Sequence, residues 1–224
     1  IIVGVDSLIE HCNIIDLLWF PSFCFNKEAY KNCKATLKSG WDSFLIQKRL
    51  PTREWKPGKN VLVLTGGCDI TKLNKSLPTH LDITLDKDVS LHWVQGPFSS
   101  PPHLPVTQRL NWKTHIAPSN LDKLIVESNY VLTIFGITFF EVLQYGIPSV
   151  VFSPYGEKDN EEMIALKGEN VACVSPNAEN AVKELKRLMK NDQLAQNFST
   201  LASEKMAING SQQLAKSVCL MANA

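Results

Sequence analysis

Short runs of uninterrupted apolar residues, rich in β-branched side chains, recur along the chain and alternate with helix-like patterns. The clearest run is 60–65, which ends in Gly66-Gly67. Because such runs are apolar at successive positions rather than at every second one, they predict strands that are buried on both faces, as in a parallel sheet. Similar runs occur at 1–5, 15–20, 89–94, 130–135, 148–152 and 170–174.

Helical patterns lie between these runs and after the last of them. Ser119 is predicted to cap a helix over 121–128, and Ser175-Pro176 to open a helix with an apolar stripe. Two further patterns, around 194–201 and 214–221, close the chain. The alternation of strands and helices predicts an α/β fold built on a Rossmann-like doubly wound parallel sheet.

A polar segment at 51–59, which contains two prolines, precedes the strongest strand and is typical of a linker. We therefore expect residues 1–50 to be the incomplete end of an amino-terminal α/β domain and 60–224 to form a ligand-binding α/β domain. The chain enters directly into an apolar run without an initiator Met, which we interpret as the continuation of a longer protein.

Composition excludes several classes of protein. The 224 residues carry 23 Lys and Arg against 22 Asp and Glu, so a basic surplus that would neutralise nucleic-acid phosphates is absent. The most apolar stretch, 14–25, is about half of the ~20 residues that a membrane span needs. The six cysteines form no C-x-x-C pair, which argues against a metal site and favours reduced thiols in the cytoplasm.

The first candidate site is the turn after the 60–65 strand, with Gly66, Gly67, Cys68 and Asp69. Two glycines allow the backbone to approach a ligand closely, and ligands of open α/β sheets bind beyond the carboxyl ends of strands. A tight turn without any ligand explains the same residues equally well.

The second candidate lies in the segment 135–148, where a strand, a glycine and a short apolar helix follow one another. Gly136 and Ile137 begin the helix, and its open amino end suits a phosphate. Thr138 and Glu141 lie on one narrow polar face, where the carboxylate is placed to accept hydrogen bonds from sugar hydroxyls. The alternative is an ion pair between Glu141 and a Lys or Arg of a neighbouring element.

The third candidate is the polar loop 153–162, which opens a helix and places Asn160 and Glu161 near its start. An ordinary helix-capping loop is the simpler explanation of this loop. His115 lies at a predicted strand end and is a weak candidate for a ligand contact, whereas His92 is expected to be a core residue.

Together these motifs resemble the carboxy-terminal half of the GT-B-fold nucleotide-sugar enzymes. The carrying residues are 66–69, 136–138 with Glu141, 146–148 and the loop ending at Asn160. The pattern is most similar to the UDP-sugar hydrolase of pseudaminic acid biosynthesis and to the N-acetylglucosaminyltransferase family that makes lipid II, and it covers about residues 1–175. No Ser–His–Asp order or other catalytic motif is present beside it.

The resemblance implies roles for single residues. Gly66 and Gly67 would approach the diphosphate, and Gly136, Thr138 and Glu141 would hold diphosphate and ribose. The backbone around Ile116, within 115–117, would meet the uracil. Three departures are Cys68 in place of a serine, the bulky Phe135 in place of a small residue, and a 159–162 loop that lacks the glutamine of the family's sugar-reading loop.

From the resemblance we expect the UDP-sugar-binding part of an enzyme that hydrolyses or transfers a glycosyl group in surface-polysaccharide or nonulosonic-acid biosynthesis. The family's catalytic histidine lies in the amino-terminal domain and has no counterpart in this chain, so the catalytic residues are unknown and the fragment alone is expected to be inactive. No cofactor is implied; the partners are UDP or a UDP-sugar and a missing amino-terminal domain or partner chain. The alternative is a non-catalytic, degenerate nucleotide-sugar-binding subunit.

Overall fold

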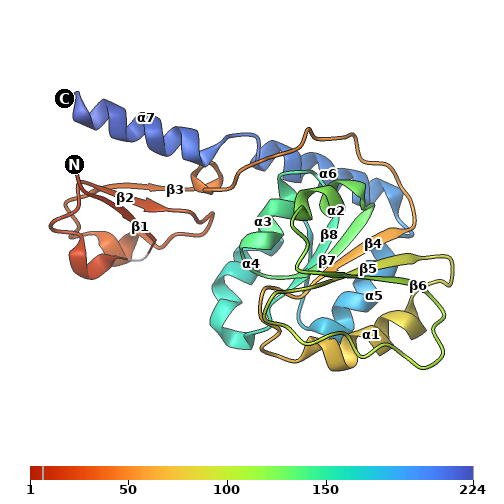
Figure 1. Cartoon of the computed structure of the whole chain (residues 1–224). Coiled ribbons are helices and arrows are strands. Elements are labelled where there is room, and N and C mark those ends of the chain that lie inside the picture. Colours follow the sequence, from red (N-terminus) through yellow and green to blue (C-terminus); the bar gives the residue numbers. More distant parts are fainter. Residues whose placement is uncertain (7, 224) are drawn as a thin grey trace. The chain divides into compact units, whose positions relative to one another are not determined.

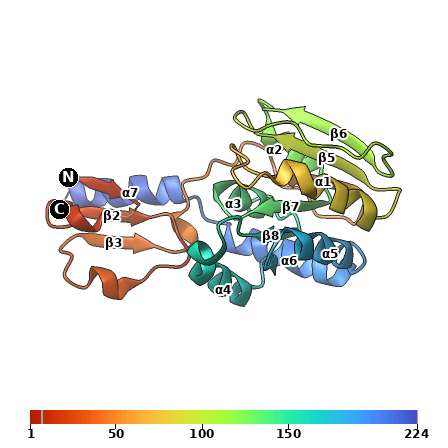
Figure 2. The same ribbon diagram turned by 90° about the horizontal axis from the view of Figure 1, so that it is seen from below.

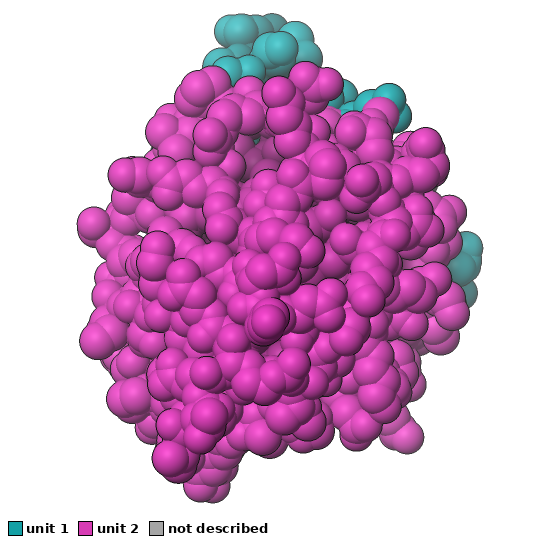
Figure 3. All heavy atoms as spheres, turned by 90° about the vertical axis from the view of Figure 1, so that its right-hand side faces the viewer, with its two compact units in different colours: residues 1–47, 204–224 teal, residues 48–203 magenta. Residues whose placement is uncertain are grey.

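A computed structural model describes residues 1–6 and 8–223, so that Ser7 and Ala224 lie outside the described residues. The chain forms two compact units (Figures 1 and 3). Unit 1 comprises 1–47 and 204–224, and unit 2 comprises 48–203. No helix of the described residues is both long and apolar enough to cross a membrane.

Unit 2 is built on a six-stranded parallel sheet with the order β6-β5-β4-β7-β8-β9. From β4 the chain adds strands toward one edge and, from β7, toward the other, so the direction reverses between β4 and β7. The strands are β4 (Asn60–Leu64), β5 (Ser90–Gln95), β6 (Asn111–Ile116), β7 (Tyr130–Ile134), β8 (Ser149–Phe152) and β9 (Cys173–Ser175). The α/β fold with a doubly wound parallel sheet is thus confirmed.

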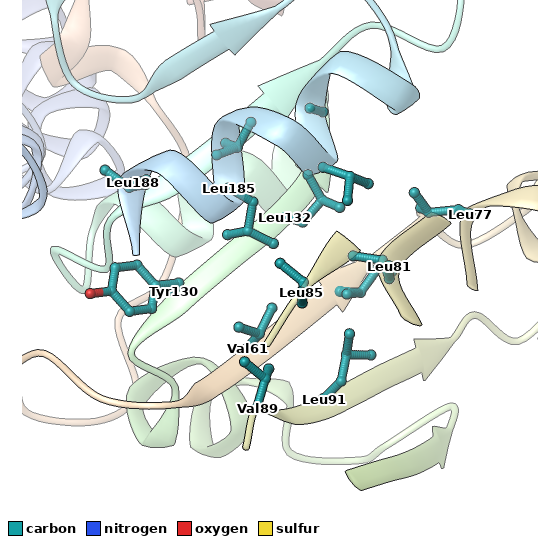
Figure 4. Packing of buried hydrophobic residues seen from close by; sticks show 14 of the residues in the cluster. Val61, Leu77, Leu81, Leu85, Val89, Leu91, Tyr130, Leu132, Leu185 and Leu188 are labelled. Atoms are coloured by element: carbon teal, nitrogen blue, oxygen red, sulfur yellow. The ribbon is translucent and has the colours of Figure 1, made fainter. Parts of the chain in front are cut away.

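Helices cover both faces of this sheet (Figure 2). Val61 and Val63 of β4 pack with α1 (Leu73–Thr84), α5 (Ala178–Leu188) and α6 (Asp192–Lys205). Figure 4 shows leucines of α1 and α5 meeting Val61 and Leu132 in this core. Leu62 and Leu64, which alternate with these valines, pack on the other face, which is covered by α2 (Leu121–Glu127) and α3 (Ile137–Leu143). Burial on both faces is why these strands are apolar at every position.

The remaining elements of unit 2 follow β8. A 3₁₀ turn, η4 (Gly156–Asp159), leads into α4 (Asn160–Glu169), whose Met163 and Leu166 are buried. α4 ends at Asn170 in the left-handed conformation, just before β9.

The structure corrects one local prediction and confirms another. Asn120, not Ser119, caps α2, because the Asn120 side chain accepts a 3.0 Å hydrogen bond from the Lys123 N–H. Strand β6, at whose end His115 was predicted to lie, is confirmed; it had no apolar run of its own, since it is a sheet edge whose residues are exposed or half-buried.

Unit 1 contains a three-stranded parallel sheet of β1 (Val3–Val5), β2 (Leu17–Phe20) and β3 (Thr36–Ser39). The 3₁₀ turns η1 (Ile9–His11), η2 (Lys27–Tyr30) and η3 (Trp41–Ser43) connect it, and α7 (Gly210–Ala222) packs against η3. At this contact, a Cβ atom on Gly210 would overlap the backbone of Ser43 and Phe44. The last helix of the chain therefore belongs with the first residues.

The predicted domain boundaries, 1–50, 51–59 and 60–224, stay a prediction; the compact units divide instead after residues 47 and 203. The 51–59 segment packs on unit 2. The Trp55 side chain is buried and its indole Nε1 donates a 2.7 Å hydrogen bond to the carbonyl of Asn129, while Arg53 donates to the carbonyl of Val126. A single buried tryptophan thus anchors a segment whose other residues are polar.

Candidate functional site

Two adjoining pockets open in unit 2 beyond the carboxyl ends of β4 and β7, where the strand order reverses. Gly66, Gly67 and Thr138 line both of them. The β5-side pocket, of about 290 Å³, is also lined by residues 95–97 and 117–118; the α3-side pocket, of about 250 Å³, is also lined by 133–137 and Tyr155. The structure therefore brings the first two predicted motifs together although about seventy residues separate them.

The Gly66-Gly67 turn forms the floor shared by the two pockets. Gly66 has a φ of +87°, which favours glycine, and Gly67 is exposed, with no atom within 4 Å of the position of a Cβ. A Cβ on Gly96 would overlap the carbonyl oxygens of Gly66 and Gly67. Gly96 was missed by the sequence analysis, although a glycine directly after an apolar strand was the available signal.

Helix α3 starts after Gly136, whose φ of +151° lies in the region that favours glycine. Phe139 and Phe140 are buried, whereas Thr138 is half-buried at both pockets. Although the helix is apolar along most of its length, Ile137 is not buried: it is 57% exposed and lines the α3-side pocket. The first turn of the helix is thus open at the site.

Glu141 lies one turn beyond Thr138 and is half-buried. Burial raises the pKa of its carboxyl, and the negative charge of Asp122 adds to the rise, while Arg49 and a hydrogen bond from Thr138 lower it. No ion pair involves Glu141 among the residues that the structure describes, so the predicted alternative, pairing with a Lys or Arg, is not observed. Glu141 is absent from the described linings of both pockets, whereas Thr138, its hydrogen-bond partner, lines both.

Asp69 and Cys68 have different surroundings. The carboxylate of Asp69 accepts hydrogen bonds from the N–H groups of Leu73, at 2.8 Å, and Asn74, at 2.6 Å. It therefore holds the start of α1, and both of its oxygens are engaged. Cys68 is exposed and lines the α3-side pocket.

The other predicted residues lie outside the described linings of both pockets. Ile116 is the last residue of β6 and is 72% exposed, and the next two residues line the β5-side pocket in its place. Asn160 and Glu161 are exposed in the first turn of α4. From the same loop, Tyr155 reaches the α3-side pocket.

The two strand histidines form a pair on β5 and β6. Nδ1 of His92 lies 3.1 Å from Nε2 of His115, and the rings are nearly parallel. Burial lowers the pKa of both imidazoles, and the charge of Lys113 lowers both further. Within residues 1–6 and 8–223, no group of three or more His, Cys, Asp or Glu side chains is arranged to hold a metal ion.

Comparison with solved structures reveals the same architecture in glycosyltransferases. UGT2 of Phytolacca americana, complexed with UDP-2-fluoro-glucose and pterostilbene, is 16% identical over 92% of this chain, with a TM-score of 0.63. MurG of Acinetobacter baumannii is 15% identical over 91% of the chain, with a TM-score of 0.57. The glycosyltransferase VinC, in complex with dTDP, is 15% identical over 93%, with a TM-score of 0.57.

The chain spans 54% of the length of UGT2, 52% of VinC and 73% of MurG, so it is similar to about half of most of these proteins. No protein-family model and no curated protein sequence matches the chain. At these identities the likeness concerns the fold. The chain accordingly has the architecture of the GT-B glycosyltransferases, with a Rossmann-like domain that carries the two pockets.

Proposed function

We propose that this chain is the nucleotide-sugar-binding part of a GT-B-like enzyme that transfers, or hydrolyses, the glycosyl group of a UDP-sugar. The observation that carries the proposal is that Gly66, Gly67 and Thr138 line both pockets at the reversal of the strand order. That is the position at which open α/β sheets bind their ligands. The UDP-2-fluoro-glucose of the UGT2 complex and the dTDP of the VinC complex support this class of ligand.

In this proposal the diphosphate lies over the Gly66-Gly67 turn, where the absence of side chains lets it approach the backbone. Backbone N–H groups at Gly136 and the open first turn of α3 would stabilise the charge that develops on the diphosphate as it leaves. The ribose hydroxyls would donate hydrogen bonds to the carboxylate of Glu141, and the uracil would enter the β5-side pocket beside Ala117. The base that activates water or an acceptor alcohol is not assigned to any residue of this chain.

The pathway and location belong to the same proposal. We assign the reaction to surface-polysaccharide or nonulosonic-acid biosynthesis, with an amino-terminal domain or partner chain completing the enzyme. Among the residues that the structure describes, the six cysteines form no disulfide, which supports a cytoplasmic location, since reduced thiols persist there.

A second candidate is a non-catalytic nucleotide-sugar-binding subunit. It is favoured by Cys68, which is exposed at the site where the family has a serine, and by Asn160 and Glu161, which lie outside the described linings of the pockets. Both candidates require UDP binding. They differ in turnover once the remaining part of the enzyme is supplied.

Isothermal calorimetry with UDP tests the shared claim. We expect binding to the wild type and at least about tenfold weaker binding to a Glu141→Ala variant, the effect of one strong polar contact. A thermal-shift panel of UDP, GDP, CMP and dTDP then ranks the bases, and UDP at 100 times its Kd should stabilise the protein by about 2.7 kcal/mol. No heat with UDP, or equal affinity in the variant, contradicts the proposed site.

A further inference from the structure

The cation that acts on Glu141 is engaged by another carboxylate. A guanidinium nitrogen of Arg49 lies 3.2 Å from a carboxylate oxygen of Asp122, on α2. The Asp122 side chain is 9% exposed, whereas the Arg49 side chain is 64% exposed. Asp122 is also the neighbouring negative charge that acts on Glu141. The positive charge of Arg49 therefore acts on two carboxylates, Asp122 of α2 and Glu141 of α3, and Arg49 forms its ion pair with the more buried one, Asp122.

Tyr145 links Asp122 to the backbone of Arg49 through hydrogen bonds. Its hydroxyl donates a 2.6 Å hydrogen bond to the second carboxylate oxygen of Asp122 and accepts hydrogen bonds from the backbone N–H groups of Arg49, at 3.1 Å, and Leu50, at 3.2 Å. Tyr145 is 1% exposed. Both the backbone and the side chain of Arg49 are thus tied, directly or through Tyr145, to Asp122.

We propose that Asp122 is a positioning residue that holds Arg49 away from Glu141 and so leaves Glu141, without a cationic partner, as an acceptor for two vicinal hydroxyls of a ligand. The ligand class is a ribonucleoside diphosphate, and this part of the inference rests on the proposed function. If Arg49 bound Glu141 instead, a guanidinium would occupy the carboxylate lone pairs that a ribose needs. Asp122 thus serves as the counter-ion of Arg49 in place of Glu141.

Two further groups, one on α3 and one beside Tyr145, do not replace Arg49 as a partner of Glu141. Thr138, on the same helix, is uncharged and donates a hydrogen bond to Glu141. Lys48 has its ammonium 5.7 Å from the centre of the Tyr145 ring, and burial lowers its pKa. The charged groups that act on Glu141 are therefore Asp122 and Arg49. Replacing Asp122 should consequently free Arg49 to pair with Glu141.

A double-mutant cycle without any ligand tests directly whether Asp122 keeps Arg49 from pairing with Glu141. The pKa of Glu141 is followed by NMR titration of its side-chain carboxyl in the wild type, Asp122→Asn, Arg49→Gln and the double variant. Asparagine keeps an oxygen for the Tyr145 hydroxyl. We expect Arg49→Gln to raise the pKa of Glu141 much more in the Asp122→Asn background than in the wild type, because only there does Arg49 pair with Glu141. An equal effect in both backgrounds overturns the proposal, since Asp122 would then act only through its own charge.

UDP affinity measured on the same four proteins gives the second readout. We expect Asp122→Asn to bind UDP about tenfold more weakly, and the double variant to recover to within about threefold of the wild type. A merely structural role of Asp122 would not be rescued by removing Arg49. Arg49→Gln alone should retain wild-type affinity, and a tenfold loss in that variant overturns the proposal without requiring Asp122→Asn to fold. If the wild type binds no UDP, the proposed function fails, and the ligand-free cycle still decides whether Asp122 withholds Arg49.

Discussion

The hydroxyl of Tyr145 donates a 2.6 Å hydrogen bond to the buried carboxylate of Asp122. The same hydroxyl oxygen accepts the N–H groups of Arg49 and Leu50, so one side chain satisfies two backbone groups at the start of unit 2 and one carboxylate oxygen of α2. A buried oxygen with three partners is costly to remove, because each of these hydrogen bonds would be lost.

Replacement of Tyr145 by phenylalanine should lower the free energy of unfolding by about 1 to 3 kcal/mol, the cost of unsatisfied buried groups. Urea unfolding at neutral pH measures the change. The matched control is Tyr130→Phe, because the buried Tyr130 hydroxyl has no hydrogen-bond partner within the part of the chain that the structure describes. We expect that control to be neutral or stabilising; equal losses in the two variants would mean that the Tyr145 contacts contribute nothing.

Gly67→Ala should leave stability almost unchanged and weaken UDP binding about tenfold or more, since a methyl group would occupy space that the proposal assigns to the diphosphate. The position tolerates a Cβ, because no atom lies within 4 Å of it. Gly168→Ala, at an equally open position on α4, is the control and should bind UDP as the wild type does. Calorimetry and thermal unfolding on both variants separate a lost site from a lost fold.

Thiol labelling should distinguish the cysteines by surroundings. Burial, with the charge of Glu184 beside it, raises the pKa of Cys173 to about 11, so at pH 8 only about one molecule in a thousand carries the reactive thiolate there. Cys68 and Cys219 are exposed and should react with iodoacetamide much faster. Added UDP should protect Cys68, at the α3-side pocket, and leave Cys219 unchanged; mass spectrometry of the peptides reads both. Equal labelling of Cys68 with and without UDP would place the ligand elsewhere.

Acid should destabilise the fold through the histidine pair. The pKa values of His92 and His115 are lowered in the folded state, chiefly by burial, so the unfolded chain binds more protons than the folded chain. Their contribution to stability is present above the ordinary histidine pKa of about 6.5 and is lost as pH falls through the lowered values. Urea unfolding between pH 7.5 and pH 5 should therefore show a smaller fall in stability for His92→Gln than for the wild type. Parallel curves would show that the pair does not link folding to protonation.

The local order of the strands and glycines was available from the amino-acid sequence. The runs at 60–65 and 130–135 are apolar at successive positions because both faces of β4 and β7 are covered, and that burial leaves a signature in the residues themselves. The glycines that follow these strands could also be recognised from the sequence. The turns at Gly66 and Gly136 need backbone conformations that other residues adopt only with strain. Edge strand β6 has one or both faces open and carries no such signature.

Which side chains meet was decided only by the tertiary structure. Asp69 was predicted as a ligand contact, and that stays a prediction; its role at the start of α1, where its carboxylate accepts two backbone N–H groups, could not be read from the sequence. The neighbours of Glu141 were equally unpredictable, because Arg49 and Asp122 are 92 and 19 residues away from it in the chain. Periodicity in the sequence indicates on which face of its own helix or strand a residue lies. The adjacency of β4 and β7 depends instead on the order in which distant strands pair, and this order brings Gly67 and Thr138 to the same pockets.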